Sequence, residues 1–216
     1  FVQPDGTVVN DLLAKAAGNH EVISAFLGRH QGEDQARALE LLRSLSDKDL
    51  VDITDEILED NMSVTSASGI PPVLCPRVEN EFLTPYKSFF TTTAFLAEEQ
   101  KELSDPQKLI EWVRDSIRLT GSTKAWRIAM SPAGVYEART ADPRSRDIFF
   151  VSLARTLGID ARKDPVTGKV QYKESGVWTD VDFGNASQSV APAGKLVPKY
   201  SPTGTLPEPG DHNSLH

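Results

Sequence analysis

Residues 142–162, DPRSRDIFFVSLARTLGIDAR, combine reactive side chains with a long apolar run. Ser145 and Asp147 stand near the beginning of this stretch, and Asp182 follows on a later segment. A serine becomes a nucleophile when a base takes its proton, and two carboxylates across a cleft can hydrolyse a glycoside. One hypothesis is therefore an active hydrolase on a glycan or peptide that uses these three residues. It requires Asp147 and Asp182 to face one open pocket at roughly 5–10 Å.

The sequence offers little to activate such a nucleophile. Its four histidines lie far from residue 145 along the chain, at His20, His30, His212 and His216. We therefore expect Ser145 to support a helix cap. Cys75 lies between Pro72 and Pro76 with no histidine nearby, so we expect it to behave as a small buried hydrophobe.

The elements around this stretch predict an α+β core. Asp142 is the expected N-cap of a helix, Pro143 its first residue and Gly158 its left-handed end. The apolar residues between them cover nearly the whole circumference, which is typical of a helix buried on most sides. Three short strands are predicted at 159–163, 168–173 and 177–183, with turns at DPVTGK and KESG. A second capped helix is predicted to begin at Asp105 and Pro106.

Residues 8–60 have helical periodicity, including one helix over about 33–45 and another capped by Asp47. The last helix carries an apolar stripe and, opposite to it, an acidic face that we interpret as solvated. This face comprises Asp49, Asp52, Asp55, Glu56, Glu59 and Asp60. The proline-rich residues 61–85 predict a connection across the surface, followed by a short helix at 86–101.

Three segments in this order resemble a transglutaminase-like domain, which has the papain-type α+β core. They are KLIEWVRDSIRL, FFVSLARTLGIDAR and GVWTDVDF, and the resemblance covers about 105–183. The segments SPAGVYEARTADPRSRDIFF and DPVTGKVQY are similar to a branch found in large multidomain bacterial proteins.

The resemblance implies a cysteine at the first turn of the buried helix, a histidine on the next strand and an aspartate one strand further. Here Pro143 stands at the cysteine position, and the histidine strand, TGKVQY, contains no histidine. Asp182 alone matches the triad. Because two of three catalytic groups are missing, the resemblance implies a domain without the family's acyl-transfer or thiol-protease chemistry.

Composition limits the partners. The net charge is −8 over 216 residues, which argues against nucleic-acid binding, and no apolar run is long enough for a membrane span. We expect no cofactor and no metal site. The chain begins with Phe1 rather than Met, so we expect it to be part of a longer protein, whose export stays an open possibility.

The resulting prediction is a non-catalytic transglutaminase-like domain that binds or scaffolds within a larger bacterial protein. Its partners would be other domains of the parent chain, and a polysaccharide or peptide is a further candidate. The division would be a helical region at 1–104, the core at 105–183, and a linker or the start of a further domain at 184–216. A purely structural spacer is the remaining alternative; it requires Arg146 to lie against a carboxylate, with no concave site near Pro143. The predicted binding residues are Arg146, Asp147, Gln171, Tyr172, Asp182 and Trp126.

Overall fold

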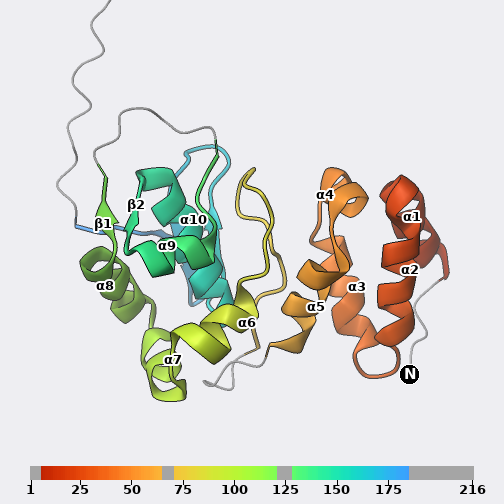
Figure 1. Ribbon diagram of the computed structural model, residues 1–216, viewed down its shortest axis with the longest axis horizontal. Helices are drawn as coiled ribbons and strands as arrows, with labels where there is room; N and C mark the ends of the chain where they lie inside the picture. Colours follow the sequence, from red (N-terminus) through yellow and green to blue (C-terminus); the bar gives the residue numbers. More distant parts are fainter. Residues whose placement is uncertain (1–5, 65–70, 121–127, 185–216) are drawn as a thin grey trace, which may run out of the picture. The chain divides into compact units, whose positions relative to one another are not determined.

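The computed structural model describes residues 6–64, 71–120 and 128–184 (Figure 1). Their architecture is α+β, as predicted: helices predominate, with one parallel pair of strands and one antiparallel sheet of three strands. No helix in these ranges has the length and apolarity needed to cross a membrane. The predicted segment 184–216 lies, apart from Gly184, outside the described residues.

The N-terminal helices bury their apolar stripes against one another. They are α1 (Gly6–Ala16), the short 3-10 turn η1 (Ala17–Asn19), α2 (His20–Arg29), α3 (Gln35–Arg43), α4 (Asp47–Asp52) and α5 (Asp55–Ser63). Their buried side chains form the N-terminal cluster, which includes Leu12, Ile23, Phe26, Leu41, Leu50 and Leu58. The predicted amphipathic patterns are confirmed here.

The single helix predicted from Asp47 is wrong, because the chain breaks at Ile53 and Thr54, which have extended backbone angles. The N-cap is Ser46, whose hydroxyl accepts the amide N–H of Asp49. The acidic face is also not uniformly solvated, since Asp49 and Asp60 are 2 % and 5 % exposed. Both carboxylates have polar partners from distant segments, which sequence periodicity does not reveal.

Residues 71–86, which we call the strap, are not the predicted surface connection. Leu74, Glu81 and Tyr86 are buried in it. Leu74 belongs to the N-terminal cluster, whereas Val78 packs on a second group of apolar residues, the C-terminal cluster. At the end of the strap, Asp60 accepts the amide N–H groups of Tyr86, Lys87 and Ser88, so its buried carboxylate joins α5 to the next helices.

The following elements lie around the C-terminal cluster. They are α6 (Lys87–Phe89), the π-helical turn η2 (Phe90–Ala94), α7 (Ala97–Leu103), α8 (Pro106–Ser116), β1 (Arg118–Leu119), α9 (Pro132–Ala138) and β2 (Thr140–Ala141). The cap predicted for α8 is confirmed, since Asp105 accepts the N–H groups of Gln107 and Lys108. The boundary between the N-terminal and C-terminal clusters lies within the strap. The sequence analysis instead predicted that the helical region ends at residue 104.

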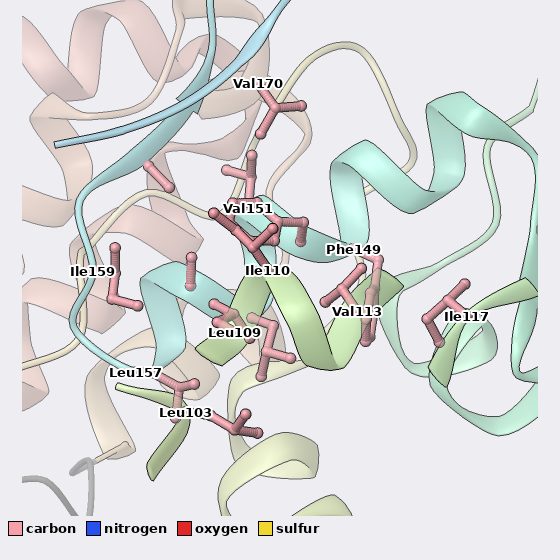
Figure 2. Close-up of a cluster of buried hydrophobic side chains, with 14 of the residues drawn as sticks. Leu103, Leu109, Ile110, Val113, Ile117, Phe149, Val151, Leu157, Ile159 and Val170 are labelled. Atoms are coloured by element: carbon pink, nitrogen blue, oxygen red, sulfur yellow. The ribbon is translucent and has the colours of Figure 1, made fainter. Parts of the chain in front are cut away.

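Helix α10 (Pro143–Thr156) is the buried centre of the second half, and α9 lies beside it (Figure 1). Figure 2 shows side chains of α8 and α10, among them Leu109, Val113 and Phe149, gathered in the C-terminal cluster. Gly158, at φ 84°, ends α10 as predicted. The backbone then enters the antiparallel sheet, in the order β3 (Ala161–Lys163), β4 (Val170–Glu174) and β5 (Val177–Asp180).

Candidate functional site

The first turn of α10 is the position where the resemblance places a nucleophile. Pro143 occupies the first helical position, and Asp142 accepts the amide N–H groups of Arg144 at 3.0 Å and Ser145 at 3.2 Å. The Ser145 hydroxyl also donates to Asp142 and accepts the amide N–H of Met130 at 3.0 Å. This confirms that Ser145 supports the cap. Burial raises the pKa of Asp142, but the hydrogen bonds from Ser145 and the backbone outweigh it, so the pKa lies below its usual value.

Arg146 and Asp147 lie in a chain of charges that leaves α10. Arg146 pairs with Asp147 at 3.2 Å, and Lys163 of β3 lies 3.8 Å from the same carboxylate. Lys163 and Arg144 both reach Glu79 in the strap, at 3.4 and 2.7 Å. The charges connect α10 to the sheet and to the strap.

Burial governs the electrostatics of this network. Desolvation raises the pKa of Asp147, although the charges of Arg146 and Lys163 oppose the change. The guanidinium of Arg146 lies 4.1 Å from the ring centre of Phe183, and its Nε is buried without a hydrogen-bond partner in the described chain. Arg146 is thus held by an aromatic ring and a carboxylate, as the spacer alternative requires.

The structure does not bring Gln171 and Tyr172 to an open cleft. Tyr172 is 1 % exposed, and its hydroxyl accepts a hydrogen bond from Gln107 at 2.7 Å. Gln171 bonds to Arg162 at 3.0 Å and to Asp180 at 2.8 Å, across the three strands. Tyr172 is therefore a core residue, and Gln171 belongs to a polar ladder on the sheet.

The remaining predicted residues lie apart from these. Asp182 is exposed and accepts the amide N–H of Gly184 at 2.8 Å. Trp126 lies outside the described residues. Of the histidines, His20 and His30 are described, and both belong to the N-terminal helices. The described residues therefore place no histidine beside Asp182.

Two buried basic residues were missed by the sequence analysis. Lys87 is fully buried, and its side-chain amine donates to the carbonyl of Val73 in the strap. Arg155 of α10 is 8 % exposed and donates to three carbonyls, those of Ala161, Cys75 and Arg77. A charge within an otherwise apolar buried helix needs partners, so the sequence could have predicted that Arg155 is buried and hydrogen-bonded. Lys87 lies in a short irregular segment, where no sequence pattern indicates burial.

Four cavities within the described residues lie elsewhere. None of these four is lined by Pro143, Ser145, Arg146, Asp147 or Asp182. No group of three or more His, Cys, Asp or Glu side chains among the described residues could hold a metal ion. Comparisons with family models, curated proteins and solved structures gave no match.

Proposed function

We propose that residues 105–183 are a transglutaminase-like core without its catalytic chemistry, which acts as a binding or scaffolding module in a larger bacterial protein. The observation that carries this proposal is the first turn of α10. Pro143 occupies the position that the resemblance gives to a nucleophilic cysteine, and proline has no side chain that can attack a substrate. The other segments of the resemblance correspond to α8 and to β5 with the residues after it.

The electrostatics of this turn support the same role. A helix N-terminus lowers the pKa of a thiol, or stabilises an oxyanion, through its free N–H groups. In this chain the carboxylate of Asp142 accepts two of those groups, and it also accepts the Ser145 hydroxyl. The polar atoms that chemistry would require are thus engaged in holding the fold. The proposed partners are other domains of the parent chain, with a polysaccharide or peptide as further candidates.

The test is an assay of the purified chain for amine incorporation, glutamine deamidation and peptide cleavage, with an active transglutaminase as the positive control. We expect rates equal to the buffer background. Ser145→Ala and Asp182→Asn are the matched variants, because they remove the candidate nucleophile and the triad aspartate. Turnover that either variant abolishes would overturn the proposal and favour the hydrolase hypothesis.

A structural spacer is the second candidate, and one observation favours it. Arg146 lies against Asp147, and both side chains are mostly buried, at 12 % and 17 % exposed. Such a pair stabilises a defined packing arrangement only while both partners remain, since removing one leaves an uncompensated charge. A spacer and a scaffold differ in whether the surface binds anything, so a ligand site elsewhere on the chain distinguishes them.

A further inference from the structure

A cavity of about 390 Å³ lies where α4, α5 and the strap meet. Its apolar lining comes from Ile53, Ile57 and Leu83, of which the first two are 2 % and 5 % exposed. Its size falls in the range of cavities that bind small molecules. The break between α4 and α5 therefore changes the direction of the chain and also forms one side of this cavity.

One wall of this cavity is fixed by buried polar contacts. Asp49 pairs with Arg77 of the strap, and the Arg77 guanidinium also donates to the carbonyl of Glu81. The Glu81 carboxylate in turn accepts the amide N–H groups of Val78 at 2.7 Å and Glu79 at 2.8 Å. Burial raises the pKa of Asp49, but its hydrogen bonds to Arg77 and Ser46 outweigh this, so it stays ionised. The wall is thus held in place before any ligand arrives.

Two opposite charges line the same cavity without a partner. Lys48 and Asp52 are exposed, four residues apart on α4, and no hydrogen bond or ion pair engages either side chain within the described residues. Their order also opposes the helix dipole, because a cation stands near the N-terminus of α4 and an anion at its C-terminus. Local stability therefore does not explain these two charges.

The strap adds an exposed aromatic ring to the lining. Phe82 is 72 % exposed, and it lines the cavity together with the apolar residues described above. The surface thus offers a cation, an anion and an apolar area to one ligand.

We propose that this cavity binds a short peptide with free ends. The ammonium end pairs with Asp52, the carboxylate end with Lys48, and an apolar side chain packs on Phe82 and Leu83. Side chains four apart on a helix have Cβ atoms about 5–6 Å apart, and two extended residues span at most about 7 Å. The spacing of the two charges therefore fits a dipeptide. A neutral saccharide would leave both charges unpaired, so the peptide is favoured. The proposal goes beyond the role proposed for the core at 105–183 and does not depend on it.

The experiment is a calorimetric titration of the full chain with leucyl-phenylalanine, which has free ends, and with its N-acetylated and C-amidated forms. We expect each blocked form to bind about tenfold more weakly, which is the order of one charge-assisted hydrogen bond. Lys48→Gln should make the free acid and the amide bind alike, and Asp52→Asn should do the same for the free and acetylated amine. Phe82→Ala should weaken all three ligands.

The controls are exposed residues on α7 and just before it that do not line this cavity: Lys101→Gln, Glu98→Gln and Leu96→Ala. Circular dichroism and thermal unfolding check that each variant is folded. Equal affinity for free and blocked peptides overturns the proposal, as does binding that neither charge variant changes. Titration with N-acetylglucosamine oligomers covers the saccharide; binding of those alone, or no peptide binding at millimolar concentration, also overturns it.

Discussion

The first turn of α10 and the cavity at the α4–α5 break both carry charged and polar side chains, but they use them differently. At α10, Asp142 and Ser145 bond to each other and to backbone amides, and Arg146 lies against Asp147. At the cavity, Lys48 and Asp52 remain without partners in the described chain. At the first turn of α10 the side chains of Asp142 and Ser145 are satisfied internally, whereas the cavity presents two charges that have no partner among the described residues.

This difference shows how a polar residue's role can be judged from its contacts. A buried polar group that meets its partners inside the protein contributes to the fold, and removing a partner leaves the other unsatisfied. An exposed charge without a partner contributes little to stability, so its removal costs little. Variants at the first turn of α10 should therefore lower the free energy of unfolding more than variants of the two cavity charges.

The largest effect is expected for Arg155→Met. This change removes the donors to the carbonyls of Ala161, Cys75 and Arg77, and the lost bonds should reduce the free energy of unfolding by roughly 3 kcal/mol or more. Arg43→Met, an exposed arginine on α3, is the matched control and should change it by less than about 0.5 kcal/mol. Denaturation in urea measures both values. If Arg155→Met lowered the free energy of unfolding no more than the control does, the hydrogen bonds of Arg155 would not stabilise the fold.

The next expected effect is a change of stability with pH that is caused by Lys87. Burial lowers the pKa of this lysine to about 7, and the like charge of Arg155 acts in the same direction, against the opposing charge of Asp60. Between about pH 7 and 9.5 the unfolded chain binds this proton while the folded chain does not. Stability should therefore rise with pH in this window, by at most about tenfold in the unfolding equilibrium constant per pH unit.

Lys87→Met tests this assignment, because the variant cannot bind the proton in either state. Urea denaturation at several pH values gives the slope for both proteins, and the difference between the slopes isolates Lys87. Identical slopes would show that the amine carries its proton in the folded state at neutral pH.

A smaller effect compares two aspartates, one from each region. Asp142→Ala removes an N-cap and the acceptor of Ser145, which should cost about 1–2 kcal/mol. Asp52→Ala removes an unpaired exposed charge and should change stability by less than about 0.5 kcal/mol. Thermal and urea unfolding of the two variants give a direct comparison. Equal losses would mean that Asp52 has a structural partner and would weaken the contrast between the regions.

Local signals in the sequence were sufficient to predict α10 and the antiparallel sheet that follows it. Asp142 with Pro143 marks the beginning of the helix, and Gly158 marks its end, because each acts on its immediate backbone neighbours. The turn between β4 and β5 was also predictable, since Ser175 and Gly176 both have positive φ, at 50° and 85°. In all of these cases the interacting groups are within a few residues of one another.

The errors on the acidic face have a common physical cause, which is pairing between residues distant along the chain. Asp49 was expected in solvent because its helix face is acidic, but Arg77 of the strap neutralises it. Asp60 likewise accepts three amides at residues 86–88. Helical periodicity describes which residues share a face; it does not show which partner covers that face. The cavity depends on the same distant contacts, so no local pattern predicted it.

The smallest expected effect is a gain in stability. Exchanging the two cavity charges, in the double variant Lys48→Glu/Asp52→Lys, keeps the net charge and aligns both side chains with the dipole of α4. The free energy of unfolding should rise by about 0.5 kcal/mol, from a few tenths for each end of the helix. Binding of leucyl-phenylalanine should fall at the same time, because the orientation of its ends would no longer match the cavity. A gain in stability together with a loss of binding would show that the native order of these charges is less stable than its reverse and is retained for a ligand. A double variant that binds the free peptide as well as the native chain would instead place Lys48 and Asp52 among ordinary solvated surface charges.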